Sequence, residues 1–421
     1  MYRQNIFKIS IACALIAWSS LHFGAIVSLA HAEAGITQED ILAKSQASEG
    51  MTRTEQGLYL EAEQAFKKSI QTNPNNSASR HQYSNLLYRL GRLEEALVQI
   101  QKAAEISPHE PLLHTTVGEI LLTLGRPEEA LPLYDKAVEV APNSSSGYQM
   151  RADYYWGIGR LDKALQGYHK AWTLDPDNLI IIPAFAHMYS QLGEQSKAFC
   201  WARRGIEAGP KQFYTNYVMA LVHIYAGNEE LALKHLRTSL EDKTTLNPLS
   251  LSLVILRDYE IQHGRFDEAF TLYKEYYPRL FDSVLPEITL SNNFAAIGIA
   301  FVLQQMGRQD QADKLIDASL KYLTNTPKQG WSGNVIADVL IYSLRGDKQQ
   351  ALAALRKAID SGWRNQWGYE LDYDLILQSI RNEPQFQVMH NEIKKDFAKQ
   401  SERIKAMKNE NDVCTAEKVL K

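Results

Sequence analysis

The chain has 421 residues, of which 45% are hydrophobic and 22% are charged, and its formal net charge is −4. These values are typical of a soluble folded protein and exclude a disordered or collagen-like chain. A weakly acidic chain has no general attraction for nucleic acid, so no nucleic-acid partner is expected.

Residues 1–32 are predicted to be a signal peptide. Arg3 and Lys8 form a positively charged start, an apolar run follows, and the Ala-His-Ala sequence at 30–32 offers a cleavage site before Glu33. The alternative is an uncleaved anchor, because the apolar run is as long as a bilayer span of about 20 residues. Polar and small residues dilute the middle of the run, which favours cleavage (Ser19, Ser20, His22 and Gly24).

An exported protein, periplasmic or secreted, is therefore expected, and a membrane-anchored protein facing the periplasm is the alternative. The periplasm applies if the source is a Gram-negative bacterium. Membrane contact is expected only through the N-terminal segment, if that segment stays uncleaved, because no other window is apolar enough to span a bilayer.

A period of 34 residues runs through the chain after this segment. It separates the members of a glycine column (Gly57, Gly91, Gly125, Gly159, Gly193 and Gly227). Alanines follow five residues later (Ala62, Ala96, Ala130, Ala164, Ala198 and Ala232), and prolines keep the same period (Pro74, Pro108, Pro142, Pro176 and Pro210). A fixed period of this length predicts an array of helical hairpins.

Each column has a physical reason. Glycine can adopt the left-handed conformation that ends the first helix of a hairpin. Alanine lets the two helices approach closely, because a larger side chain would overpack the contact. Bulky residues four positions after the alanines fill the space between neighbours (Phe66, Ile100, Tyr134 and Tyr168), and proline ends the second helix.

These columns, with Gly118 or Ala152 at the small position of the first helix, resemble the tetratricopeptide repeat family. The resemblance covers residues 43–212 as five full repeats, with a sixth to about 246. It implies an all-α fold, a right-handed superhelical solenoid of antiparallel helix-turn-helix repeats. It also implies a protein or peptide partner rather than catalysis, since the family is a general interaction scaffold.

Four segments are predicted: a signal peptide at 1–32, six regular repeats at 33–246, three diverged repeats with insertions at 247–365, and C-terminal capping helices with a tail at 366–421. The diverged repeats keep the five-residue step from glycine to alanine, as from Gly264 to Ala269. The end of the chain, including the sequence Leu-Asp-Tyr-Asp at 371–374, resembles the terminal segment of many bacterial tetratricopeptide proteins. In those proteins the array often follows a regulator or cyclase domain, whereas here it follows an export signal.

The resemblance also implies a concave groove that is lined by the first helix of each hairpin. Carried over position by position, its lining is predicted to be His81, Asn85, Tyr88, Arg89, Thr115, Glu119, Gln149, Asp153, Trp156, His187, Tyr214, Tyr217 and Leu221. Rings mixed with single polar groups suit peptide recognition. The alternative is that Trp156 and the tyrosines pack between repeats. The carboxylate clamp of chaperone-binding members is not predicted, because only Asn85 fits it.

No sequence motif predicts catalysis, a cofactor or a metal site. His109 and His114 are five residues apart with a proline between them, which does not match a zinc protease. Cys200 and Cys414 lack metal-site spacing, and whether they pair stays open. The predicted function is an exported scaffold that binds a protein or extended peptide in its concave groove, with an envelope complex as one setting. The alternatives are a membrane-anchored sensor or regulatory subunit, and an enzyme with an unrecognised site in the diverged repeats.

Overall fold

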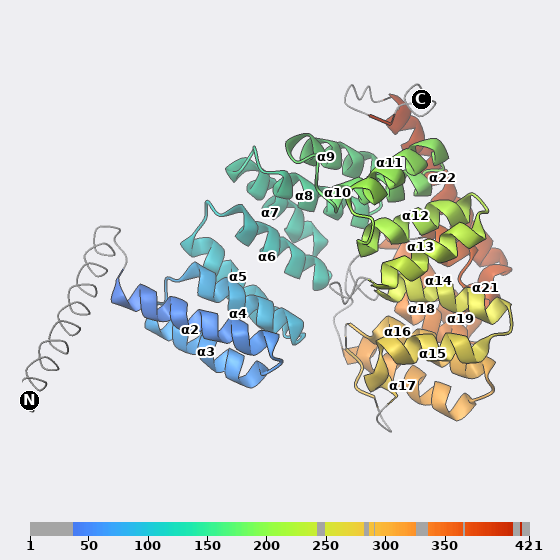
Figure 1. The fold of residues 1–421 in the computed structure, drawn as a ribbon, viewed down its shortest axis with the longest axis horizontal. Helices are drawn as coiled ribbons and strands as arrows, with labels where there is room; N and C mark the ends of the chain where they lie inside the picture. Colours follow the sequence, from blue (N-terminus) through green and yellow to red (C-terminus); the bar gives the residue numbers. More distant parts are fainter. Residues whose placement is uncertain are drawn as a thin grey trace, which may run out of the picture. The chain divides into compact units, whose positions relative to one another are not determined.

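The computed structural model describes residues 37–241, 249–281, 286–289, 291–325, 336–364, 367–406 and 413–414. Within these ranges the secondary structure is helical and contains no strand (Figure 1), so the prediction of an all-α fold is confirmed. The predicted signal peptide at 1–32, the connections at 242–248 and 326–335, and most of the C-terminal tail lie outside the described ranges.

The chain separates into two compact units, residues 1–108 and 109–421. The first unit contains two helix pairs, α2 (Gln38–Glu55) with α3 (Tyr59–Thr72) and α4 (Ser77–Arg89) with α5 (Leu93–Ile106). The sequence did not predict this division, because Pro108 belongs to the same column as the other repeat-closing prolines.

The second unit begins with seven further helix pairs. They are α6 (Pro111–Thr123) with α7 (Pro127–Val140), α8 (Ser145–Gly157) with α9 (Leu161–Leu174), α10 (Ile181–Gln191) with α11 (Gln195–Ala208), α12 (Phe213–Tyr225) with α13 (Glu229–Glu241), α14 (Leu249–Gln262) with α15 (Phe266–Tyr276), α16 (Asn293–Gln305) with α17 (Gln309–Asn325), and α18 (Ala337–Leu344) with α19 (Lys348–Asp360). A short 3₁₀ turn, η1 (Pro278–Leu280), follows α15. The unit ends with α20 (Trp367–Asp372), η2 (Leu375–Leu377), α21 (Gln378–Arg381) and α22 (Pro384–Ala406).

The turn glycines adopt the conformation that the repeat pattern predicts. Gly91, between α4 and α5, has a φ of +73°, and the glycine at the corresponding turn of every other pair is also left-handed. The N–H of Gly91 donates to the carbonyl oxygen of Tyr88, and that of Arg92 donates to Leu87. These bonds satisfy carbonyl groups at the end of α4 and reverse the chain into α5.

Within a pair, a small residue of the first helix faces a ring of the second. A Cβ added at Gly118 of α6 would lie 2.7 Å from the Tyr134 ring of α7, and one added at Gly50 of α2 would lie 2.8 Å from the Phe66 ring of α3. The alanine of each pair is also buried; Ala96 and Ala130 have no exposed surface. The small-residue, alanine and ring positions of the repeat therefore reflect close contact between the two helices of each pair.

The last pair of the second unit returns to an early one. A Cβ added at Gly362, just after α19, would lie 3.3 Å from the Ile158 carbonyl oxygen in the turn between α8 and α9. Side-chain atoms of Arg364 occupy the space beside Gly159 in the same turn. The pairs from α8–α9 to α18–α19 therefore close on themselves, and α22 lies beside α11 in Figure 1.

The segment between α20 and α21 docks on α14 through a buried charged group. The Arg257 guanidinium donates from Nε to Asp258 at 2.8 Å and from an Nη atom to Asp374 at 2.7 Å. The Tyr369 hydroxyl donates to the second oxygen of Asp258 at 3.2 Å, and the backbone N–H of Leu375 donates to it at 3.3 Å. Arg257 is 1% exposed and each aspartate 2%.

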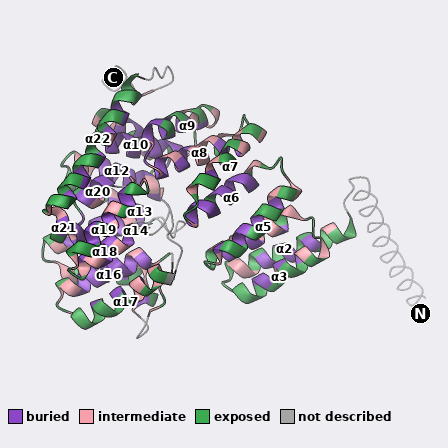
Figure 2. Ribbon diagram, turned by 180° about the vertical axis from the view of Figure 1, so that it is seen from behind, coloured by how far each residue is buried: buried purple, intermediate pink, exposed green. Residues whose placement is uncertain are grey.

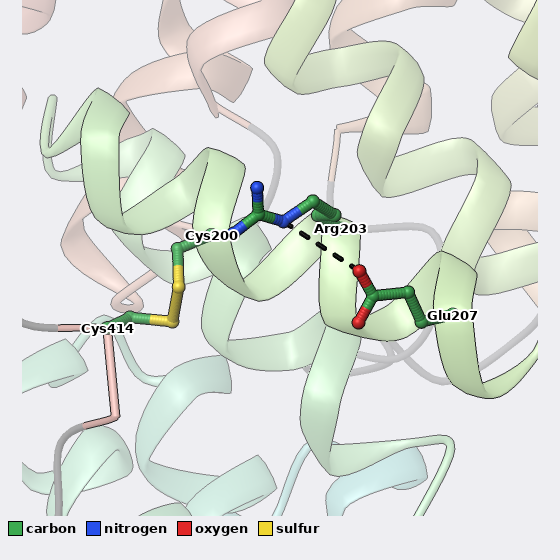
Figure 3. Close-up of a disulfide and its surroundings, with 4 residues drawn as sticks. All are labelled: Cys200, Arg203, Glu207 and Cys414. Atoms are coloured by element: carbon green, nitrogen blue, oxygen red, sulfur yellow. Dashed lines mark ion pairs between the residues drawn. A yellow bond between two sulfur atoms is a disulfide. The ribbon is translucent and has the colours of Figure 1, made fainter. Parts of the chain in front are cut away.

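A disulfide joins Cys200 of α11 to Cys414 beyond α22 (Figure 3). The two cysteines are separated by 214 residues in the sequence, and their Cα atoms lie 5.8 Å apart. Figure 3 also draws Arg203 and Glu207 of α11, an exposed ion pair of 3.9 Å. The pairing that the sequence left open is therefore formed, and it fixes the end of the chain to the third pair of the second unit.

The turn glycines give a prediction for stability. No atom lies within 4 Å of a Cβ added at Gly91, so Gly91→Ala introduces backbone strain and no clash. We expect Gly91→Ala to lower the free energy of unfolding by about 1–2 kcal/mol, the cost of a left-handed L-residue. Gly91→Asn should cost clearly less, because asparagine tolerates this conformation. Urea unfolding followed by circular dichroism measures both; equal stability of Gly91→Ala and the parent chain contradicts the role given to the glycine.

Candidate protein-binding groove

In the first unit, α4 carries four of the predicted groove residues on one side. His81, Asn85 and Tyr88 follow at intervals of four and three residues, which places them on one face of the helix, and Arg89 adjoins them. The first three side chains are half-buried and Arg89 is exposed. We call these four residues the α4 face. It combines an aromatic ring, an amide and a cation, and part of each side chain is accessible.

The opposite side of α4 is held by a polar network that the sequence analysis missed. The Tyr83 hydroxyl donates to Glu63 of α3 at 2.8 Å, and Arg92 donates to the other oxygen of the same carboxylate at 2.7 Å. Arg92 also binds Glu95 of α5. The Arg92 hydrogen bond lowers the pKa of Glu63 to about 2, so this carboxylate stays charged. The network ties α3, α4 and α5 together behind the α4 face.

In the second unit, Glu119, Gln149 and Asp153 form an acidic group on α6 and α8. Glu119 is exposed, whereas Gln149 and Asp153 are half-buried. The Tyr168 hydroxyl donates to Asp153 from α9. Burial raises the pKa of Asp153 to about 7, and the nearby Glu119 charge adds to the rise. The acidic group therefore has a proton-dependent charge close to neutral pH.

Four further predicted residues form an aromatic row inside the second unit (Trp156, His187, Tyr214 and Tyr217), while the predicted Thr115 and Leu221 are buried. The rings of Trp156 and His187 have centroids 5.0 Å apart, and His187 Nδ1 lies 3.2 Å from the Tyr214 hydroxyl. Trp156 Nε1 donates to Gln191 at 3.3 Å. Trp156 is 8% exposed, and His187 and Tyr217 are 2% exposed. These three side chains support the inner face but offer little surface to a ligand.

The inner helices of the second unit are buried more completely than an open groove would allow. Every residue of α10 is buried, as are most residues of α12 and α16 (Figure 2). Part of the cover is the chain's own α20. A Cβ added at Gly368 would lie 2.8 Å from the Tyr225 hydroxyl of α12, and the Glu370 charge acts on Tyr217. The burial agrees with the alternative that Trp156 and Tyr217 pack between repeats, whereas the cover by α20 was not predicted from the sequence.

A cavity of about 540 Å³ lies between α13, α14 and α15 and bears on the enzyme alternative. Among its lining residues are Arg237, Glu260, Asp267, Glu268 and Glu275, but no histidine, cysteine or serine. Glu260 is paired with Arg265 and Arg237. Asp267 and Glu268 stand in the first turn of α15, where carboxylates stabilise the helix. The cavity is therefore lined by helix-starting and ion-paired carboxylates, beside the hydroxyl groups of Thr271 and Tyr276.

Two absences hold for the part of the chain that the structure describes. In that part no group of three or more histidine, cysteine, aspartate or glutamate side chains is arranged to hold a metal ion. No described helix combines the length and the apolar character that crossing a bilayer requires.

The acidic group and the aromatic row predict opposite effects of pH on stability. The folded pKa of Asp153, about 7, lies above its ordinary value of 3.8, so the folded chain holds a proton that the unfolded chain loses as pH rises. Its contribution to stability therefore falls between about pH 4 and pH 7. Burial lowers the pKa of His187 to about 3, below its ordinary value of 6.5, so its contribution falls as pH drops through that interval.

We expect Asp153→Asn to gain stability relative to the parent chain as pH rises from about 4 to 7, on the order of 1 kcal/mol. His187→Gln should gain relative stability as pH falls from about 6 to 4. Urea unfolding at a series of pH values measures both differences. Asp135→Asn, at an exposed position of α7, controls for the amide substitution. A pH-independent difference for Asp153→Asn would show that its carboxyl titrates normally.

Two sequence models described as tetratricopeptide repeat match the chain, over residues 53–115 and 118–178. No curated protein matches it. A solved tetratricopeptide repeat protein from Parabacteroides merdae ATCC 43184 is 15% identical, with a TM-score of 0.46; the match covers 56% of this chain and 92% of that one. PilW, described as a type IV pilus biogenesis factor, is 15% identical, with a TM-score of 0.43 and coverage of 50% and 98%.

YrrB, described as a TPR protein with an unusual peptide-binding site, is 21% identical, with a TM-score of 0.32 and coverage of 45% and 96%. The segments matched by the sequence models include α3, α4 and α5 in the first unit and α7, α8 and α9 in the second. The left-handed turns at Gly57, Gly91, Gly125 and Gly159 lie in the same segments. Family pattern and helix pairs therefore coincide, and residues 53–115 and 118–178 are repeats of the tetratricopeptide family.

Proposed function

We propose that the chain is an exported scaffold that binds an extended segment of a partner protein on the α4 face. This face belongs to the first helix of its pair, the helix that this family offers to ligands. The proposed role is binding without catalysis, and it needs no cofactor.

The observation that carries the proposal is the contrast between α4 and the inner helices of the second unit. Asn85 and Tyr88 keep accessible surface, whereas His187 and Tyr217 are almost fully buried. A tyrosine ring supplies contact area with few rotatable bonds, and an amide can pair with the backbone of an extended peptide. The network around Glu63 holds α4 in place before a ligand arrives, which reduces the entropy lost on binding.

The disulfide supports the proposed export. Bonds of this kind persist in the periplasm or outside the cell and are rare in the reducing cytosol. Cleavage of the signal before Glu33 gives a periplasmic or secreted scaffold; retention of residues 1–32 gives the same scaffold on a membrane anchor. N-terminal sequencing of the mature chain distinguishes the two forms, and a start at Glu33 is expected.

Binding is tested with a photo-crosslinking amino acid at position 88, compared with the same amino acid at Lys102 on the exposed side of α5. We expect position 88 to capture one dominant protein from envelope fractions and position 102 to capture none. The captured protein is then purified, and its affinity is measured for the parent chain and for Asn85→Ala with Tyr88→Ala. The double variant should bind at least about tenfold more weakly, as expected when interface anchors are removed.

Gln101→Ala with Lys102→Ala is the matched control, because both side chains are exposed on the neighbouring helix. Circular dichroism must show that both double variants are folded. Unchanged affinity in the α4-face variant, or the same loss in the control, would rule out the α4 face as the binding surface.

A further inference from the structure

The C-terminal half of α22 forms a strap across two turns of the second unit. We define the strap as residues 397–406 together with Cys414. The Gln400 amide donates to the Gly159 carbonyl oxygen at 2.7 Å and accepts from the Asp162 N–H at 3.3 Å. Arg403 pairs with Asp162 at 2.8 Å, and Lys405 pairs with Glu194 at 3.0 Å. The strap therefore bridges the α8–α9 turn and the α10–α11 turn.

These contacts become weaker toward the end of the helix. Phe397 is 4% exposed and stacks on Trp367 with ring centroids 5.1 Å apart. Beyond Ser401, by contrast, no residue of the strap on α22 is buried, and the Arg403 and Lys405 side chains are 47% and 58% exposed. Ion pairs of exposed side chains contribute little to stability, because water screens them. Ile404 packs on the core but is only half-buried. One partly buried apolar side chain and exposed polar contacts would let the last turns of α22 open readily without a further attachment.

The disulfide supplies the missing attachment. Cys414 has no exposed surface, and Cys200 on α11 is 8% exposed. The bond joins the far end of the strap to the same helix pair whose turn binds Ser401 and Lys405 through Glu194. A covalent link keeps the strap next to its contacts and so prevents it from separating after they break.

We propose that the Cys200–Cys414 disulfide locks the strap onto the second unit, so that the strap is held in the oxidised chain and released in the reduced chain. Formation of this disulfide converts the two cysteine thiols into one S–S bond. A disulfide oxidant takes up the two electrons and two protons and becomes a dithiol. Reduction of the disulfide is the reverse exchange, with a dithiol reductant. The cellular setting of this lock rests on the proposed export, because oxidation would follow transfer out of the reducing cytosol.

Release of the strap changes the charge of the turns beneath it. Asp162 is 4% exposed and is paired with both Arg160 and Arg403. Without the strap, Asp162 loses Arg403, and Glu194 loses both Ser401 and Lys405. The reduced chain would therefore present an acidic edge at these two turns, whereas the oxidised chain covers it with its own basic helix end.

The test uses the full chain with Cys13→Ser, which leaves Cys200 and Cys414 as its only cysteines. Mass spectrometry measures trypsin cleavage at the bonds that follow Arg403 and Lys405. Every sample is reduced after the reaction is stopped. Treatment of the folded chain with dithiothreitol should raise the initial rate of cleavage at these two bonds by about tenfold or more, because cleavage requires local opening of the helix. Reoxidation should reverse the change, and Cys414→Ser should cleave rapidly without reductant. Cleavage after Lys67 and Lys68 of α3 is the internal reference and should stay constant.

Gln400→Ala tests the non-covalent contacts separately. In the oxidised chain it should change the rate by less than about twofold, because the covalent link remains. Equal cleavage rates in the oxidised and reduced chains would overturn the proposal, as would two free thiols in the folded chain before reduction. Release of the strap by Gln400→Ala alone would overturn it as well. Since the assay uses the purified chain without a partner, its outcome is independent of whether the α4 face binds one.

Discussion

The buried guanidinium of Arg257 decides how the second unit is built. One cation lies between two carboxylates, Asp258 of its own helix and Asp374 of the returning segment, and all three are almost completely removed from water. Without Asp374 the guanidinium keeps Asp258 but loses the charged hydrogen bond to the returning segment, which contributes about 1.5–3 kcal/mol. This bond favours docking of the segment from α20 to α21 on α14. The return of the chain, the cover on α12 and the position of α22 all depend on this docking.

This docking divides the array into parts with different consequences for binding. Where α20 lies on α12, the aromatic row becomes part of a core, and its histidine and tyrosine rings stabilise the fold from within. In the first unit, α4 keeps a face whose ring and amide are partly exposed. Ligand binding is therefore expected on a small part of the surface that the family resemblance suggested. The closed part provides a rigid body fastened by the C-terminal strap.

Local features of the fold could be predicted from the sequence because they arise from contacts between neighbouring residues. The left-handed turn at Gly91 and the close approach of Gly118 to Tyr134 lie within single repeats, and a period of 34 residues reveals them. The ion pair between Arg257 and Asp374 spans 117 residues, and the disulfide spans 214. Contacts between residues so far apart produce no repeating pattern in the sequence. The predicted groove residues lie on first helices, and packing of Trp156 and Tyr217 between repeats was one of two alternatives. The sequence could not decide between them, because it does not show that α20 lies on α12.

A double-mutant cycle on Arg257→Met and Asp374→Asn, measured as free energies of unfolding, tests most directly whether the C-terminal segment docks on α14. If the returning segment docks through this pair, the two substitutions should couple by about 1–3 kcal/mol. The cycle of Arg257→Met with Asp372→Asn, two residues away and paired with His390, should be additive within about 0.5 kcal/mol. Additive effects of Arg257→Met and Asp374→Asn would contradict the docking of the C-terminal segment on α14, and with it the closed second unit.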